Sequence, residues 1–245
     1  SPDLNDAAKD RLLIESQLRE AIREQQFMLY YQPKIDIRTG QLIGYETLLR
    51  WLRPDNTMVP PLKFIPVAES TGLIVQIGEW IIWEACRFLA RQHARGYKTT
   101  VSVNLSARQF TDSDLPALVE RILKRTGASP EHLIFEITES MLMGDTDAAI
   151  NQLNELKRLG LALSIDDFGT GYSSLSYLKL FPVDELKIDR SFVKDIPDDR
   201  NDMDITAAII AMAQKMGLRV VAEGVESAAQ VEFLKNNACY LVQGY

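Results

Sequence analysis

The sequence predicts an α/β protein built as a (β/α)₈ barrel, also called a TIM barrel, and three observations lead to this fold class. Strand-like and helix-like patterns alternate along most of the chain, the strand-like runs number eight, and most of them are apolar throughout. Continuous apolar runs indicate strands that are covered on both faces, as parallel strands between helices are. An open doubly wound sheet fits the same alternation and is the alternative.

The first element is an expected helix over residues 10–25, where Ile14, Leu18 and Ile22 follow one another at intervals of four. The chain begins with Ser1 rather than Met. We therefore interpret residues 1–25 as an N-terminal connector helix from an upstream regulatory domain, and residues 26–245 as the main domain.

The first two strands, residues 27–33 and 41–51, are separated only by the segment KIDIRTG. This segment is too short for a crossover helix, so the two strands are expected to form an antiparallel hairpin. The predicted fold is therefore a modified barrel with an antiparallel first strand.

The remaining strands are expected at residues 99–106, 132–138, 161–167, 183–189, 219–225 and 240–244. Helices are expected at 73–95, 114–126, 146–159, 202–217 and 227–237, with a shorter one near 173–179. No helix-like pattern follows the last strand, so the final helix of the barrel is expected to be absent from this chain and the domain to be truncated at its C-terminal end.

Composition narrows the partners and the compartment. The chain of 245 residues carries 27 basic and 34 acidic side chains, a net charge of −7, which argues against binding DNA or RNA polymers through a broad basic face. Its two cysteines, Cys86 and Cys239, are far apart, so neither a disulfide framework nor a thiolate metal site is expected. No apolar run has the ~18 residues of a spanning helix. The expected location is the cytoplasm, either free or as the cytoplasmic part of a larger, membrane-attached protein.

Polar residues recur at the ends of the predicted strands, where barrel enzymes carry their chemistry. A carboxylate such as Glu136, inside the apolar run HLIFEIT, is costly unless it is paired or binds a metal ion. Any one of these residues by itself is equally well explained as a cap or a rim charge, but their recurrence at consecutive strands favours a site. The set is Glu46, Asn104, Glu136, Asp166, Asp167, Lys187, Asp189, Glu223 and Gln243.

Five carboxylates in one pocket would repel one another and take up protons unless cations were present. Oxygen ligands, with only His93 and His132 in the chain, indicate Mg²⁺ or Mn²⁺ rather than zinc. The number of ligands suggests two ions, the usual device for in-line displacement at phosphorus. Lys187 is then placed to steer a water, and Arg50 either holds a phosphate or forms a plain salt bridge.

The segment LSIDDFGTGYSSL contains Gly169 and Gly171 but no third glycine and no following lysine. It therefore matches neither the dinucleotide-binding nor the Walker pattern, and a flexible turn that carries Asp167 into the pocket explains the glycines more simply.

From about residue 27 onward the chain resembles the EAL domains, phosphodiesterases of bacterial cyclic di-GMP. The resemblance lies in eight motifs in order: YQP, ETLLRW, SVNLSARQF, FEITES, SIDDFGTGYSSL, LKIDRSFV, VVAEGVE and QGY. It implies a barrel with one antiparallel strand, hydrolysis of cyclic di-GMP to linear pGpG with Mg²⁺ or Mn²⁺ in biofilm and motility signalling, and a homodimer formed near residues 168–175. One small departure is Thr47, where the family signature has alanine.

The resemblance also implies roles for single residues. One ion would be held by Glu46, Asn104, Glu136 and Asp166, and a second by Asp166, Asp167 and Glu223. Lys187 and Gln243 would lie near the attacking water, with Glu223 as ligand or base, and Gln32 and Arg50 would contact substrate. Glu139 would anchor the loop after the fifth strand, and Asp189 and Glu226 would lie just outside the ligand set. Asp166 is expected as the last inward residue of its strand, and Asp167 as the residue that leaves the pleat.

Two other functions are open at this stage. A binding module would sense the nucleotide without cleaving it, although such modules usually have lost ligands and none is lost here. A Schiff-base enzyme would use Lys187, but the surrounding carboxylates would raise rather than lower the lysine pKa.

Overall fold

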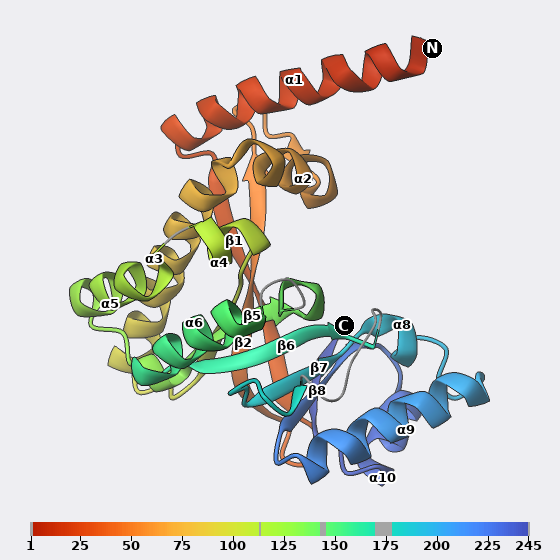
Figure 1. The fold of residues 1–245 in the computed structure, drawn as a ribbon. Coiled ribbons are helices and arrows are strands. Elements are labelled where there is room, and N and C mark those ends of the chain that lie inside the picture. Colours follow the sequence, from red (N-terminus) through yellow and green to blue (C-terminus); the bar gives the residue numbers. More distant parts are fainter. Residues whose placement is uncertain (1, 113, 143–145, 170–177, 245) are drawn as a thin grey trace.

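The computed structural model of the protein describes residues 2–112, 114–142, 146–169 and 178–244 (Figure 1). Its centre is a closed barrel, in which β1 pairs with both β2 and β9. This closure confirms the predicted barrel and rules out the open sheet. The eight barrel strands are β1 (Phe27–Asp36), β2 (Gln41–Leu52), β4 (Thr100–Asn104), β5 (Leu133–Thr138), β6 (Ala162–Phe168), β7 (Glu185–Ile188), β8 (Arg219–Val225) and β9 (Leu241–Gly244).

The first strand is the irregular one, as expected. β1 runs antiparallel to β2 and to β9, whereas the pairs from β2–β4 round to β8–β9 are parallel. The hairpin closes through residues 37–40, with Gly40 in the left-handed region at φ 69°. The predicted antiparallel hairpin is therefore confirmed, and it brings the N-terminal end of β1 to the edge of the barrel where the parallel strands end.

Helices cover the outside of the barrel. The longer ones match the predicted ranges to within two residues at each end: α3 (Leu73–Ala94), α5 (Leu115–Thr126), α6 (Thr146–Arg158), α9 (Arg200–Lys215) and α10 (Ala228–Asn236). Short helical segments are α4 (Ala107–Asp112), η1 (Pro130–His132), η2 (Glu139–Leu142) and α8 (Arg190–Val193). The short helix expected near residues 173–179 lies almost wholly outside the described residues. In the described part of the chain, β9 is the last element.

Helix α2 (Pro61–Thr71) was missed by the sequence analysis, as was the two-residue strand β3 (Met58–Val59) that pairs with β2. Proline inside a helix usually ends it, and α2 contains Pro66 as well as Pro61 at its first position. The helix forms because Phe64, Val67 and Ala68 are buried on one face. Tertiary packing here outweighs a poor local propensity.

A second hydrophobic core lies beyond the barrel, where the long β1–β2 hairpin extends toward α1 (Pro2–Arg23) and α2 (Figure 1). Leu18 and Ala21 of α1 are fully buried there, against residues of β2, α2 and α3 that include Trp51 and Phe64. We call this cluster the hairpin lobe. The second half of α1 is packed as part of the lobe, while the predicted boundary after residue 25 stays a prediction.

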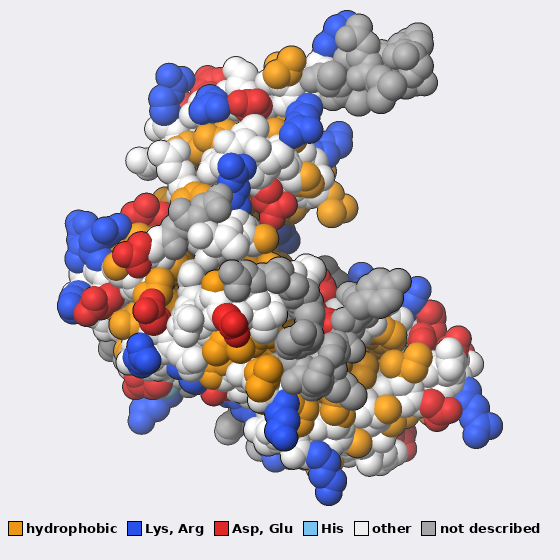
Figure 2. Space-filling view, in the orientation of Figure 1, with side chains coloured by type: hydrophobic (Ala, Val, Ile, Leu, Met, Phe, Trp, Pro, Cys, Tyr) orange, Lys and Arg blue, Asp and Glu red, His pale blue; other side chains and the backbone are white. Residues whose placement is uncertain are grey.

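On the face drawn in Figure 2, basic and acidic side chains are interspersed, and neither charge forms a large patch. Among the described helices, none combines the length and the apolar content that a membrane crossing requires.

Candidate active site

Seven barrel strands place polar side chains in one connected network at the mouth of the barrel; six do so in the C-terminal half of the strand, while Glu46 lies in the middle of β2, which continues into the hairpin lobe. Strand register produces this arrangement: Asn104 on β4 lies opposite Glu136 on β5, and Glu223 on β8 lies opposite Gln243 on β9. Between other neighbouring strands the site residues are offset by two positions, as where Glu46 lies opposite Ser102 and Glu136 opposite Ser164. Because inward positions recur every second residue, such an offset keeps the side chains on the inner face. The members joined by direct contacts are Glu46, Asn104, Glu136, Asp166, Lys187, Glu223 and Gln243.

Lys187 on β7 is the centre of this network. Its side chain is fully buried, and its Nζ lies 2.6 Å from carboxylate oxygens of Glu136 and Glu223 and 3.1 Å from those of Glu46 and Asp166. Burial alone would lower the pKa of Lys187, but these carboxylates outweigh it and raise that pKa well above its ordinary value. The ammonium therefore stays charged, which is the wrong state for a Schiff-base nucleophile.

The carboxylates differ in how they respond to this environment. Burial raises the pKa of Asp166 to about 7 against the opposing effect of Lys187, and neighbouring carboxylates add to the rise. Burial likewise raises the pKa of Glu223. Burial would also raise the pKa of Glu136, but Lys187 and Lys34 together lower it to about 2. More negative charge is gathered here than the lysines neutralise, so the site favours additional cations.

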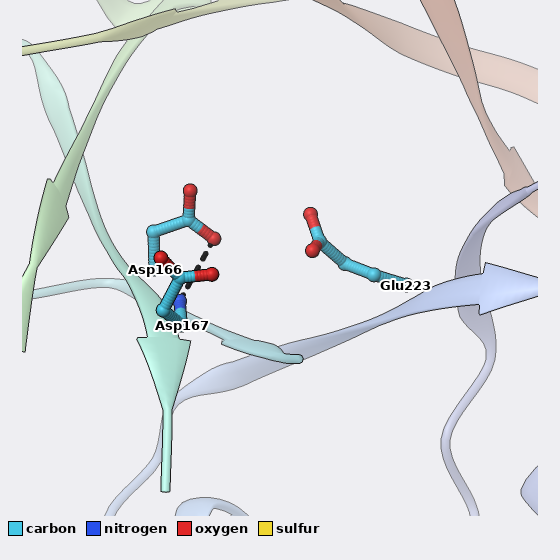
Figure 3. Close-up of side chains that lie close together, drawn as sticks. All are labelled: Asp166, Asp167 and Glu223. Atoms are coloured by element: carbon cyan, nitrogen blue, oxygen red, sulfur yellow. Dashed lines mark hydrogen bonds between the residues drawn. The ribbon is translucent and has the colours of Figure 1, made fainter. Parts of the chain in front are cut away.

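Asp166 and Asp167 share one site although they are neighbours on a strand. The pairing of β6 with β7 is irregular between Ile165 and Phe168, and Asp167 adopts the left-handed region at φ 54°. The strand does not end between the two aspartates. A bulge-like irregularity turns Asp167 out of the pleat, and its backbone N–H donates to Asp166 Oδ1 at 3.0 Å (Figure 3).

The carboxylates of Asp166, Asp167 and Glu223 point toward one another from β6 and β8 (Figure 3). One oxygen from each lies within 4.8 Å of the other two. These three residues are the set that the resemblance implies for the second ion. A set of carboxylate oxygens fits a hard divalent cation such as Mg²⁺ or Mn²⁺.

Side-chain amides hold Glu46 from both sides. Asn104 Nδ2 donates to Glu46 Oε1 at 2.7 Å, which leaves the Asn104 carbonyl oxygen for another partner. Gln243 Nε2 donates to Glu46 Oε2 at 2.7 Å and to Gln32 Oε1 at 2.9 Å, so the predicted substrate residue Gln32 joins the network. The adjacent Thr47 donates its hydroxyl to the Ser102 carbonyl, which satisfies the group that alanine would lack.

Two pockets adjoin at Leu48, which lines both. One, of about 240 Å³, includes Gln32, Glu46, Glu223 and Gln243. The other, of about 270 Å³, lies between the barrel and the hairpin lobe and includes Arg50. The Arg50 guanidinium donates to the Leu49 carbonyl and lies 5.1 Å from the Tyr30 ring centre. Among the described residues it makes no ion pair with a carboxylate, so the structure gives no support to the plain salt bridge considered as an alternative, and the role of Arg50 stays a prediction.

The structure adds two cations that the sequence analysis did not select. Arg190 on α8 lines the smaller pocket and pairs with Glu226 at 3.2 Å, which places Glu226 at the rim. Lys34 on β1 is buried beneath the site, and its Nζ lies 2.7 Å from Glu136 Oε1. Burial would lower the pKa of Lys34, but Glu136 and Glu185 raise it overall. The sequence could have identified Lys34. Side chains along a strand point alternately to its two faces, and Lys34 lies two residues from Gln32, so the two share one face.

Two other predicted residues lie beside the site. Asp189 caps α8 by accepting from the Ser191 backbone N–H at 3.0 Å, and it contributes to the raised pKa of Asp167, which burial chiefly causes. Glu139 is buried at the start of η2, directly after β5. The loop that it is expected to anchor, residues 168–175, lies mostly outside the described residues.

Comparison with known families identifies the architecture that carries this site. The family model for the EAL domain matches residues 15–245. The chain belongs to the EAL domain family. The match begins within α1, in agreement with the burial of the second half of that helix in the hairpin lobe.

Three curated relatives of this EAL domain are named as cyclic di-GMP phosphodiesterases. It is 46% identical over 99% of its length to the bifunctional diguanylate cyclase/cyclic di-GMP phosphodiesterase MucR of Pseudomonas aeruginosa, and 45% identical over 97% to cyclic di-GMP phosphodiesterase NbdA of the same species. It is 38% identical over its full length to cyclic di-GMP phosphodiesterase PdeR of Escherichia coli. The EAL domain spans 36%, 30% and 37% of these three proteins, so each relative is much longer.

Solved structures agree with the fold. A MucR phosphodiesterase in complex with c-di-GMP superposes with a TM-score of 0.91 at 46% identity, covering 95% of this chain and 94% of that one. The EAL domain of FimX from Pseudomonas aeruginosa, bound to c-di-GMP, superposes with a TM-score of 0.87 at 29% identity, covering 95% and 93%. The modified barrel is therefore the fold that this EAL domain shares with them.

Proposed function

We propose that this EAL domain hydrolyses cyclic di-GMP to linear pGpG with the help of two Mg²⁺ or Mn²⁺ ions. The observation that carries the proposal is that a charged lysine, Lys187, contacts four of the carboxylates that the family motifs imply as ligands. The other two implied ligands adjoin them: Asn104 donates to Glu46, and Asp167 lies beside Asp166 and Glu223. The names of MucR, NbdA and PdeR, and the c-di-GMP complex of MucR, support the substrate.

The proposed ligand sets assign the residues of the network to two ions. Glu46, Asn104, Glu136 and Asp166 would hold one ion, and Asp166, Asp167 and Glu223 would hold the other. When bound, such ions supply Lewis-acid activation of the phosphodiester and lower the pKa of a water. The raised pKa values of Asp166 and Glu223 fit this proposal, since burial disfavours both charged forms and the single charge of Lys187 is shared among four carboxylates.

The protein's own side chains would orient and exchange protons around the reacting phosphate. Lys187 is a fixed donor and positive charge, suited to hold a water and to balance charge that develops at phosphorus. Gln243 Oε1 is buried without a hydrogen-bond partner among the described residues, so it has an acceptor free for that water. Glu223, with its raised pKa, is suited to take the proton if it acts as base rather than as ligand.

The two adjoining pockets provide room for a two-part nucleotide. Arg50 lines one pocket and Gln32 the other, and Leu48 lines both. We place a phosphate beside Arg50, because its guanidinium is free of carboxylate partners among the described residues and guanidinium groups bind phosphate oxygens in pairs.

The test is hydrolysis of cyclic di-GMP by the purified chain, followed by chromatography of the products. We expect pGpG with Mg²⁺ or Mn²⁺, none with EDTA, and none from Glu46→Ala. The matched control is Glu79→Ala, an exposed glutamate on α3 whose partner is Arg121 on the surface, and it should keep full activity. Binding without turnover in the wild-type chain would instead establish the sensor function.

Three further expectations belong to the same proposal. We propose that the chain acts as a homodimer, which light scattering across a range of concentrations would test. We propose that it works as one unit of a larger protein with a regulatory domain, as the longer relatives do. We also propose a cytoplasmic location, with which the two free, buried cysteines agree.

A further inference from the structure

Lys34 is a buried cation beneath the carboxylate network that no family motif marks as a site residue. It lies on β1, 1% exposed, and faces the barrel interior. Its ammonium donates to Glu136 Oε1 at 2.7 Å and to Ser102 Oγ at 2.8 Å, and lies 3.7 Å from Glu185 Oε1. Three partners from three different strands therefore fix the position of this charge.

A chain of alternating charges holds Lys34 in place from below. Glu185 is 2% exposed, and its second oxygen lies 3.5 Å from Arg219, which reaches the surface at the other end of the barrel. TIM-barrel interiors are usually filled by branched apolar side chains. Moving Lys34 away would leave Glu136 with Lys187 alone and Glu185 with the half-exposed Arg219 alone. Because buried carboxylates are costly without sufficient counter-charge, the contact between Lys34 and Glu136 is favoured.

Because of this contact, the two carboxylate oxygens of Glu136 have different partners. Oε1 is committed to Lys34, while Oε2 faces Lys187 at 2.6 Å and the rest of the network. Lys187 is shared among four carboxylates, whereas the contacts of Lys34 among the described residues are with Ser102, Glu136 and Glu185, of which only Glu136 belongs to the predicted ligand sets. Toward a cation in the network, Glu136 thus presents one oxygen rather than two.

The number of oxygens that a carboxylate presents bears on which cation binds. Ca²⁺ takes six to eight oxygens and often uses both oxygens of a carboxylate, whereas Mg²⁺ requires near-octahedral geometry with shorter distances and single-oxygen ligands. We propose that Lys34 is a specificity-determining positioning residue, which holds Glu136 to single-oxygen binding and so favours Mg²⁺ over Ca²⁺. The inference rests on the proposed function, because it assumes that Glu136 is a metal ligand.

The experiment measures Mg²⁺ and Ca²⁺ affinity by calorimetry, without nucleotide, for the wild-type chain and for Lys34→Met. Loss of the lysine charge should strengthen the binding of both ions, but Glu136 can then offer both oxygens, which favours Ca²⁺. We expect the ratio of Ca²⁺ to Mg²⁺ affinity to rise about tenfold, the lower end of the changes in metal affinity that follow loss of a group behind a metal ligand. Lys157→Met is the matched control, because Lys157 pairs with Asp184 outside the barrel, and its ratio should equal that of the wild type.

Two variants keep the test decisive if Lys34→Met does not fold. Lys34→Met/Glu185→Gln removes the opposite buried charge as well, keeps the net charge, and should show the same raised ratio. Glu185→Gln alone keeps the Lys34–Glu136 contact and should leave the ratio unchanged. An equal change in the affinity for both ions in the Lys34 variants, in either direction, would overturn the selectivity proposal while the wild-type chain still binds and hydrolyses. A wild-type chain that binds neither ion would overturn both proposals.

Discussion

Replacing Lys187 by methionine removes the one charge that touches four carboxylates at once. The side chain keeps a similar length and stays apolar along its stem, so the main change is electrostatic. Glu136 and Glu223 each lose a partner at 2.6 Å, and Glu46 and Asp166 each lose one at 3.1 Å. Without a cation the carboxylates then repel one another in a buried setting.

The expected magnitude follows from burial. The Lys187 side chain is 0% exposed and that of Glu136 is also 0% exposed. Removing one member of a buried ion pair costs about 3–5 kcal/mol of unfolding free energy, because the remaining charge is left uncompensated. The contrast is Lys157 with Asp184, whose side chains are 31% and 35% exposed. This pair is partly open to solvent, and the cost of losing a pair at the surface is about 0.2–1 kcal/mol.

The assay is urea denaturation at pH 7.5, first with EDTA and then with MnCl₂. In EDTA, Lys187→Met should lose about 3–5 kcal/mol and the control Lys157→Met at most about 1 kcal/mol. Mn²⁺ at a hundred times its dissociation constant stabilises a single-site protein by about 2.7 kcal/mol. Because the ion also supplies the missing positive charge, the gap between Lys187→Met and the wild type should narrow in MnCl₂.

Equal stability of Lys187→Met and the wild type in EDTA would refute the reasoning. So would a gap that stays the same size after Mn²⁺ is added, because it would show that the lysine acts on stability through packing and not through charge.

The other predictions concern the metal sites, the hairpin lobe and the thiols. Asp166→Asn should abolish binding of both Mn²⁺ ions in a calorimetric titration, and Asp167→Asn chiefly that of one; equal occupancy in the two variants would contradict the division of ligands. Leu18→Ala should lower the unfolding free energy by about 2–5 kcal/mol, because Leu18 is fully buried in the lobe; the exposed Leu12→Ala should change it by less than about 0.5 kcal/mol. Burial raises the pKa of both cysteines to about 12, so their thiols stay protonated at pH 8 and a disulfide reagent should react with neither before unfolding; rapid labelling of the native protein would count against this burial.

Much of the fold could be read from local patterns. The length of the segment between the first two strands predicted the antiparallel hairpin, because seven residues cannot hold a crossover helix. Helix α2 was not predicted, because Pro61 and Pro66 argue against a helix. It forms because one of its faces is buried in the hairpin lobe.

The sequence predicted which residues form the candidate site, but not the contacts that they make with one another. Strand-end positions identified Glu46, Glu136 and Lys187 as neighbours in one mouth, but not that the lysine would contact four carboxylates. The bulge that turns Asp167 out of the pleat also depends on how β6 pairs with β7. The roles of these residues toward metal and substrate stay predictions that the assays above address.

The sequence by itself determined the alternation of strands and helices, the hairpin, and which residue types gather where the strands end, because all of these follow from spacing along the chain. Only the tertiary structure decided which oxygen faces which cation. Lys34 shows the reason: its partners Ser102, Glu136 and Glu185 come from β4, β5 and β7. Contacts across a closed barrel depend on the register of every strand between them, and that register is fixed by the packing of the whole sheet.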